Sequence, residues 1–96
     1  MEWAFLFLDK KLDPALHNHM MLSPGTVNRF MGVTSVQEGC ETAKKLVENG
    51  CQLIELCGGF GEEGAKEVVK AIDDAVPVAY CVYFPGGEER MKLLYD

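Results

Sequence analysis

The chain alternates between short apolar runs and longer segments in which apolar residues recur every three or four positions. Residues 3–8 are apolar at every position, which predicts a strand that is buried on both faces. Residues 51–57 are nearly as apolar, and residues 78–84 form another such run directly after Pro77. Residues 27–33 alternate between apolar and polar side chains, as expected for an edge strand. The pattern therefore predicts four strands.

Helices are predicted between these strands. Asp13-Pro14 is typical of a helix start and predicts a short helix that ends near Met21. The second helix has a capping box at residues 35–38 and a stop signal at Asn49-Gly50. Two further segments have helical periodicity or flanking signals and are predicted as a third helix and a last turn or two: residues 62–75 and residues 88–95.

Alternation of strand and helix predicts a parallel sheet with right-handed crossovers. The two most apolar early strands, residues 3–8 and 51–57, should be central, which gives the order 2-1-3-4 for strands numbered along the chain. We therefore expect an α/β fold, a truncated flavodoxin-like sheet that is mainly parallel and has helices on both faces. A half-barrel of four βα units is the alternative architecture.

Size and charge narrow the classes of partner. The chain has 96 residues, which we interpret as one α/β domain over residues 1–96. It carries 15 acidic and 9 basic side chains, so its formal net charge is −6. Nucleic acid and anionic membrane surfaces are not expected partners, because both are bound by basic surfaces. The apolar run at residues 3–8 is too short for a signal peptide or a membrane span, so a cytoplasmic location is expected.

The cysteine pattern points to free thiols. Four cysteines are present, and none of them form a C-x-x-C pair, so a zinc knuckle or a thioredoxin-type motif is not expected. His17 and His19 are two residues apart on the expected helix and would point in different directions, which argues against a metal site. The sequence predicts no metal site and names no cofactor.

The expected architecture leaves apolar surface uncovered. One short helix cannot cover four strands, and the apolar strand at residues 78–84 would lie at an edge of the sheet. Monomers rarely expose surfaces of this kind. Either the tail with Met91, Leu93, Leu94 and Tyr95 folds back over it, or another subunit does. A homo-oligomer, most simply a dimer, is predicted.

The candidate site follows the strand at residues 51–57. Four glycines occur within the seven residues 58–64, directly before an amphipathic helix. Glycines allow close approach of a ligand to the backbone, and a helix start presents unpaired N–H groups. We therefore expect Gly58, Gly59, Phe60 and Gly61, with Lys10 from the neighbouring loop, to bind a small anionic or polar metabolite. The alternative is a purely structural turn.

The same segment formally matches the G-x-G-x-x-G dinucleotide motif at residues 59–64. Glu62 and Glu63 would place two carboxylates where a pyrophosphate would lie, and the next strand ends without an acidic residue for a ribose hydroxyl. The chain is also too short for two mononucleotide-binding halves. A dinucleotide site is therefore not predicted.

Three side chains are candidates for chemistry at this edge. Glu55 lies within an apolar strand and could be a general base, or it could pair with Lys10, Lys11 or Arg29 or be exposed at the strand end. Cys57 could be an activated thiolate or a small buried filler. His17 could carry protons or bind a ligand, or it could be an ordinary surface histidine.

Two segments also resemble a known family. Asp13-Pro14-Ala15-Leu16-His17 and residues 54–61, I-E-L-C-G-G-F-G, resemble a family of small bacterial proteins, about the length of this chain, whose function is unknown. The resemblance covers essentially the whole chain. It implies that His17, Glu55, Cys57 and the glycines belong to one site. Glu62 stands where a histidine is expected after G-G-F-G, which argues against a two-histidine site.

A shorter pattern, I-E-L-x-G at residues 54–58, looks like a strand of the tryptophan synthase alpha subunit, where such a glutamate is catalytic. It supports only the half-barrel alternative. Two functional hypotheses follow from the sequence. In the first, the protein binds a small metabolite, with Glu55 as base, Cys57 as nucleophile or second acid and His17 as proton carrier if a reaction occurs. In the second, it is a non-enzymatic homo-oligomeric module.

Overall fold

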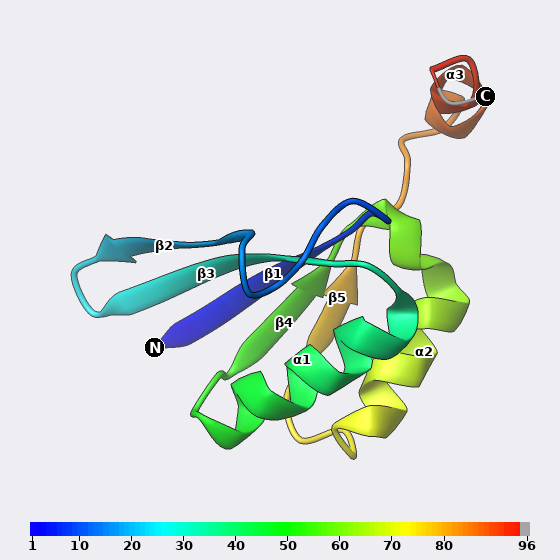
Figure 1. Ribbon diagram of the computed structural model, residues 1–96. Helices are drawn as coiled ribbons and strands as arrows, with labels where there is room; N and C mark the ends of the chain where they lie inside the picture. Colours follow the sequence, from blue (N-terminus) through cyan, green and yellow to red (C-terminus); the bar gives the residue numbers. More distant parts are fainter. Residues whose placement is uncertain (95–96) are drawn as a thin grey trace.

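The computed structural model describes residues 1–94 and consists of one mixed sheet with two helices packed against it (Figure 1). The sheet has five strands in the order β2-β3-β1-β4-β5. All neighbours are parallel except β2 and β3, which form an antiparallel hairpin. The elements in chain order are β1 (Glu2–Leu8), β2 (Asn18–Ser23), β3 (Thr26–Val33), α1 (Val36–Glu48), β4 (Leu53–Leu56), the 3₁₀ turn η1 (Gly58–Phe60), α2 (Gly61–Ala71), β5 (Val78–Tyr80) and α3 (Gly87–Lys92).

The four predicted strands keep their predicted order, because β3-β1-β4-β5 corresponds to 2-1-3-4. The α/β class is confirmed, whereas the purely four-stranded sheet is not. The half-barrel alternative is wrong, because its strands would pair in chain order. The last predicted strand is also shorter than expected, since β5 ends at Tyr80.

The helix predicted to start at Asp13 is wrong. Its first residues form a single turn, in which the Leu16 and His17 N–H groups donate to the Asp13 carbonyl at 3.0 and 2.7 Å. The chain then enters β2, an edge strand whose side chains are all exposed. Gly25, with φ of 77°, closes the hairpin to β3.

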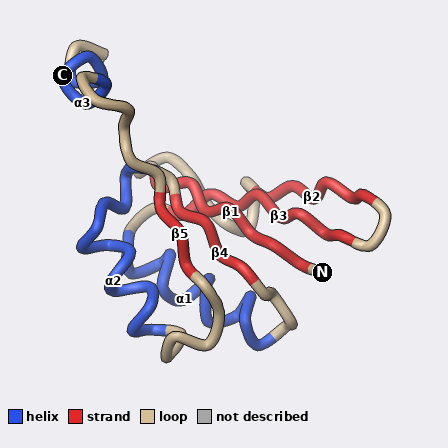
Figure 2. Tube along the Cα trace, turned by 180° about the vertical axis from the view of Figure 1, so that it is seen from behind, coloured by secondary structure: helices blue, strands red, loops and turns tan. Residues whose placement is uncertain are grey.

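The predicted distribution of helices on both faces is wrong as well. Figures 1 and 2 show α1 and α2 side by side on the same side of the sheet. Their packing encloses the core, whose largest fully buried side chains are Leu6, Ile54, Leu56, Val33 and Val68. Burial of this apolar surface is the main stabilising contribution.

The opposite face, which we call the bare face, is covered by no helix among residues 1–94. Residues paired across parallel strands share a face, and the register assigns Trp3, Phe5 and Phe7 of β1 to this one, with Phe30 of β3. Trp3 is 38% exposed and Phe7 is 44% exposed. The rings of Phe5 and Phe7 are 4.6 Å apart between centroids. The face is therefore strongly aromatic.

Residues 81–94 leave the sheet as an extended segment that ends in α3 (Figure 1). We call this segment the C-terminal arm. It does not fold back over the bare face, and Tyr95 of the predicted tail lies outside the described residues. Several apolar side chains of the arm are almost fully exposed: Val82, Phe84, Leu93 and Leu94.

Candidate functional site

The glycine-rich segment lies at the carboxyl edge of the sheet, as expected for the turn after β4. Cys57, Gly58 and Gly59 line a cleft of about 540 Å³ together with the ends of β1 and the start of the following loop. The C-terminal arm forms the other wall. The remaining lining residues are Phe7, Leu8, Asp9, Leu12, Tyr83, Glu88 and Met91. We call this hollow the edge cleft.

The glycines have different structural roles. Gly61 has φ of 64°, which favours glycine, and allows η1 to turn into α2. Gly64 packs against Phe60, because a Cβ atom there would lie 3.2 Å from the Phe60 Cβ. Gly58 and Gly59 line the edge cleft instead, and a Cβ atom at either position would meet only ordinary contacts.

Phe60 does not face the edge cleft. Its side chain is 5% exposed and belongs to the core between α1 and α2. A Cβ atom on Gly39 of α1 would lie 2.7 Å from the Phe60 ring. The predicted ligand contact of Phe60 is therefore better explained as packing, which requires the small residue at position 39.

The polar groups of the edge cleft are backbone N–H groups and carboxylates. In η1 the hydrogen bonds are donated by the N–H groups of Phe60 and Gly61, so those of Gly58 and Gly59 stay outside the turn's own bonds. Asp9 and Glu88 contribute two carboxylates to the lining, whereas Lys10 does not line the cleft. This charge distribution suits an uncharged or cationic molecule better than an anion.

Cys57 is held at the inner end of this cleft. Its Sγ atom accepts a hydrogen bond from the Leu8 N–H at 3.2 Å, and the residue is half-buried. Two other thiols are inside the core. Burial raises the pKa of the Cys40 thiol, and the charge of Glu67 adds to this effect. Burial also raises the pKa of Cys51. Cys81 is exposed on the arm.

Glu55 lies on the bare face, outside the edge cleft. It occupies a row of residues that crosses the sheet, in which His19 pairs with Phe30, Phe30 with Phe5, and Phe5 with Glu55. Glu55 lines a small hollow together with Trp3 and Phe5 of β1 and Phe30 of β3. The alternative pairing with Arg29 is wrong, because Arg29 faces the helices and pairs with Glu2 instead.

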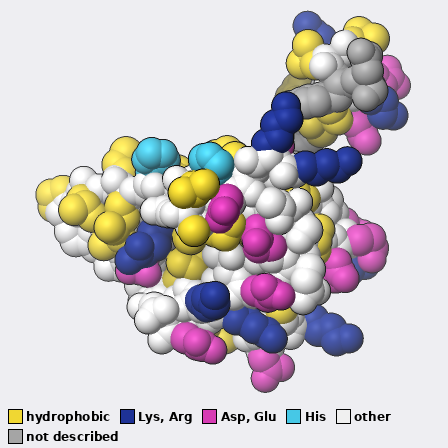
Figure 3. Space-filling view, in the orientation of Figure 1, with side chains coloured by type: hydrophobic (Ala, Val, Ile, Leu, Met, Phe, Trp, Pro, Cys, Tyr) yellow, Lys and Arg dark blue, Asp and Glu magenta, His cyan; other side chains and the backbone are white. Residues whose placement is uncertain are grey.

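His17 lies at the border of the bare face. Its Nδ1 atom accepts a hydrogen bond from the Asp13 N–H at 2.9 Å, which leaves Nε2 toward the surface. His17 and His19 line one hollow of about 260 Å³ with Phe7 and Phe30. Figure 3 shows both histidines close together along the upper border of the molecule, beside apolar side chains.

The structure does not bring Glu55, Cys57 and His17 together. Each lines a different hollow. Neighbouring strands are about 4.8 Å apart, so the three strand spacings from β2 to β4 place His19 about 14 Å from Glu55. Glu55 and the histidines share the bare face, while Cys57 shares the edge cleft with the glycines. Within residues 1–94, no group of three or more His, Cys, Asp or Glu side chains could hold a metal ion.

Sequence reasoning missed a hollow of about 650 Å³ on the helix side of the sheet. It lies between α1, the first residues of β1, β3 and the turn after Asp13, and an ion pair between Arg29 and Glu2 forms part of its wall. The signal was present, since the alternation of residues 27–33 places Arg29 on the face of Met31 and Val33. The missing information was which residue of another strand pairs with it.

Comparison with known proteins places nearly the whole chain in one family. The chain belongs to DUF6506, a family of unknown function. The family model matches residues 1–95, which confirms the expected membership in a family of unknown function over essentially the whole chain. No curated protein and no solved structure matches this DUF6506 chain. In the described part of the chain, every helix is too short or too polar to cross a membrane.

Proposed function

We propose that this protein is a self-associating module in which two copies pack their bare faces against each other. The observation that carries this proposal is the placement of both sheet-packing helices on one side, which leaves Trp3, Phe5 and Phe7 without cover. Aromatic side chains dominate the energetics of protein interfaces. An exposed sheet face of this composition on a small domain is typical of an interaction surface.

A second copy is the occupant that the row across the sheet favours. In a two-fold dimer the same surface meets itself. If the axis runs along the strands between β3 and β1, the row His19–Phe30–Phe5–Glu55 is reversed in the other copy. His19 then lies opposite the partner's Glu55, and phenylalanines fill the centre. The arrangement gives each carboxylate a partner in an otherwise apolar interface.

The C-terminal arm also favours a second copy. Its apolar side chains have little to pack against within their own chain, since Phe84 is 86% exposed and Leu93 is 84% exposed. The arm stands beside the edge cleft, next to the end of the bare face at Phe7. One chain therefore carries two uncovered apolar surfaces, and association of two copies would cover both.

Trp3 provides a direct test, because it is the one tryptophan of the chain and lies on the bare face. Sedimentation of the full chain should show twice the monomer mass of 10.6 kDa at micromolar concentration, and Trp3 emission should shift to shorter wavelength as the dimer forms. Phe5→Glu should restore the monomer and the longer wavelength, because it places a charge at the centre of the interface.

Leu16→Glu is the matched control. Leu16 is 75% exposed and lies outside the hollows of the bare face, so a charge there should leave the dimer intact. Circular dichroism would show that both variants are folded. A monomeric wild type at about 100 μM, with Trp3 emission independent of concentration, would contradict the proposal. Equal effects of the two variants would contradict it too.

A second candidate function is the binding of a small polar molecule in the edge cleft. The observation that favours it is a volume of about 540 Å³ that apolar side chains line together with the backbone of Gly58 and Gly59. Ligand pockets of globular proteins have this size and composition. A molecule with a carbonyl or hydroxyl acceptor and no negative charge fits the two N–H groups and the nearby carboxylates of Asp9 and Glu88. The separation of Glu55, Cys57 and His17 favours binding over a shared reaction.

Gly59→Ala tests this candidate, because its Cβ atom would narrow the cleft without a clash. Thermal-shift measurements with uncharged amides and polyols, and with cationic amines, should find compounds that stabilise the wild type and not this variant. Lys66→Ala, on the exposed surface of α2, is the control. Gly50→Ala is not suitable, because Gly50 has φ of 98°, a conformation that alanine rarely adopts. Equal stabilisation of all variants would contradict a site at the glycines.

We also propose that the protein works in the cytoplasm. All four cysteines are free thiols, as expected in a reducing compartment. Alkylation of the thiols in cells grown in oxidising and in reducing media would test this. All four cysteines of the protein should be alkylated equally in both media. A disulfide in the protein isolated from these cells would contradict the proposal.

A further inference from the structure

One further hollow lies apart from the two sites proposed above. It lies on the helix side of the sheet, opposite the bare face and away from the glycine turn. Its volume of about 650 Å³ is in the range of small-molecule sites. Part of the wall is apolar, formed by Met31, Leu46, Ala15 and Pro14. We call it the helix-side pocket.

The two charged side chains of the ion pair in this pocket differ in how deeply they are buried. Arg29 uses Nε to bind Glu2 Oε2 at 3.2 Å, so the two terminal nitrogens of its guanidinium group are left to other partners. Glu2 is the more buried member, 19% exposed at its side chain against 36% for Arg29. The carboxylate therefore lies deeper in the wall, and the guanidinium group lies nearer the opening.

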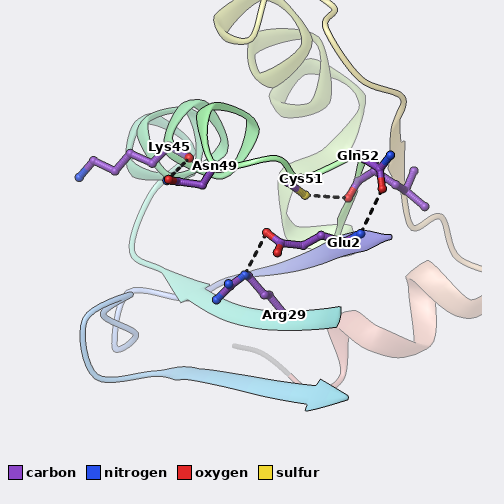
Figure 4. Close-up of polar contacts among 7 residues, drawn as sticks. Glu2, Arg29, Lys45, Asn49, Cys51 and Gln52 are labelled. Carbon is purple, nitrogen blue, oxygen red and sulfur yellow. Dashed lines mark hydrogen bonds and ion pairs between the residues drawn. The ribbon is translucent and has the colours of Figure 1, made fainter. Parts of the chain in front are cut away.

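Glu2 is fixed in place by the sheet and by one further contact. Its backbone N–H donates to Gln52 Oε1 at 3.2 Å, and its carbonyl accepts from the Gln52 N–H at 2.8 Å. Figure 4 shows Glu2 and Arg29 pointing toward each other below α1, with Asn49 on the lower side of that helix. The ion pair orients the guanidinium group of Arg29, because a planar group that is bonded through Nε has little freedom to rotate.

A second cation comes from α1. Lys45 lines the pocket, one turn before Asn49, whose Nδ2 donates to the Lys45 carbonyl at 2.7 Å. Figure 4 shows the Lys45 side chain extending outward from α1. A lysine stem is long and rotatable, so its amine can reach a ligand at the opening. The pocket lining thus includes two cationic residues and one carboxylate, on a chain whose net charge is −6.

We propose that the helix-side pocket binds a small carboxylate with an apolar body. The carboxylate would accept hydrogen bonds from the terminal nitrogens of Arg29, in the bidentate geometry that guanidinium groups provide, with the Lys45 amine nearby. The apolar body would pack against Met31 and Leu46. Thr42, 7% exposed in the same wall, adds a hydroxyl close to the helix. The proposal is independent of the bare face and of the edge cleft.

The test titrates the full-length, ¹⁵N-labelled chain with octanoate and follows amide chemical shifts. Octanamide, which has the same apolar body without the charge, is the reference compound. Octanoate should shift the amides of Met31, Thr42 and Leu46 in a saturable manner, and octanamide should bind about tenfold more weakly because it lacks the ion pair.

Three variants separate ligand binding from a structural role of the charges. Lys45→Gln should raise the Kd of octanoate about threefold, whereas Lys44→Gln, its exposed neighbour outside the pocket, should leave it unchanged. Glu2→Gln should lower the Kd about threefold, because it removes a negative charge that repels the ligand carboxylate, while the glutamine amide oxygen can still accept from Arg29 Nε. A purely structural ion pair predicts the opposite sign or no change.

Three results would overturn the proposal. The first is octanoate shifts that map outside the pocket, and the second is equal affinity for octanoate and octanamide. The third is the same affinity in the Lys45→Gln and Lys44→Gln variants. Lys45 is exposed, so its replacement leaves the fold intact even where Glu2→Gln weakens the sheet. The oligomeric state is measured in parallel. It shows whether self-association fails as well, so a failure of octanoate binding can be told apart from a failure of the dimer proposal.

Discussion

At the scale of single residues, the four thiols of this chain sit in environments of decreasing protection. Cys40 and Cys51 are buried, Cys57 is half-buried at the edge cleft, and Cys81 is exposed on the arm. Only the thiolate form reacts with electrophiles, and burial raises the pKa of both core thiols. Access and ionisation therefore act in the same direction.

We expect iodoacetamide at pH 8 to alkylate the thiols of the folded protein in the order Cys81, Cys57, and then the two core cysteines. The core thiols should react only after addition of denaturant, since their pKa is raised and the reagent cannot reach them. Mass spectrometry of tryptic peptides over time measures the order. Rapid labelling of Cys40 in the folded state would show that α1 is not packed as described.

Alternation of residues along a strand predicts which face of the sheet a side chain lies on, but not which residue it pairs with. Alternation along residues 27–33 assigns Arg29 and Phe30 to opposite faces, and the structure has this arrangement. The partner of Arg29 depends on the register between β1 and β3, which local sequence does not contain. Phe60 illustrates the same restriction: its burial depends on Gly39, a small residue on a different helix.

At the scale of elements, the end of α2 has an unusual backbone. The Asp73 N–H donates to the Lys70 carbonyl at 3.1 Å, and the Asp74 N–H donates to the Val69 carbonyl at 2.9 Å. These two bonds form a Schellman motif, in which the residue after the cap adopts positive φ. Asp73 has φ of 57°, where glycine is favoured.

Asp73→Gly should therefore stabilise the protein by about 0.5–1 kcal/mol, because glycine adopts this conformation without a Cβ penalty. Asp73→Ala is the matched control and should not stabilise, since it removes the carboxylate and keeps the Cβ atom. Urea denaturation of both variants measures the difference. A lower midpoint for Asp73→Gly than for wild type would show that the Asp73 carboxylate contributes more than the strain costs.

The element that the sequence predicted wrongly is β2. Asp13-Pro14 is a valid helix start, and its first turn does form. The turn does not continue, because the run that follows pairs with β3 across the Gly25 turn. All six residues of β2 are exposed, so burial leaves no periodic pattern from which the strand could be recognised. In contrast, the Ser35 cap of α1 is confirmed, with Ser35 Oγ accepting from the Glu38 N–H at 3.1 Å.

At the scale of the whole molecule, net charge opposes the self-association proposed for the bare faces. Each copy carries a formal charge of −6, so two copies repel each other at long range. Raising the salt concentration from about 0.01 M to about 1 M shortens the Debye length from about 30 Å to about 3 Å. An apolar interface is not weakened by this change.

The dimer should consequently become tighter as salt is added. Sedimentation equilibrium at increasing sodium chloride concentration measures the Kd, and Glu55→Gln indicates how much the pairing of Glu55 contributes. A Kd that rises with salt would show that ion pairs hold the copies together, which the aromatic composition of the bare face does not favour.

The order of the strands could be predicted because the most apolar strands must be central. The distribution of the helices could not be predicted, because it depends on the helix expected at Asp13, which does not form.

The position of β1 has a consequence for the synthesis of this protein. The central strand, residues 2–8, leaves the ribosome before both of its neighbours, which follow at residues 26–33 and 53–56. A nascent chain must therefore carry this aromatic segment without a hydrogen-bonding neighbour until β3 emerges. Chaperones that bind extended aromatic segments have a target in residues 2–8 during this interval, and slow translation should prolong the exposure.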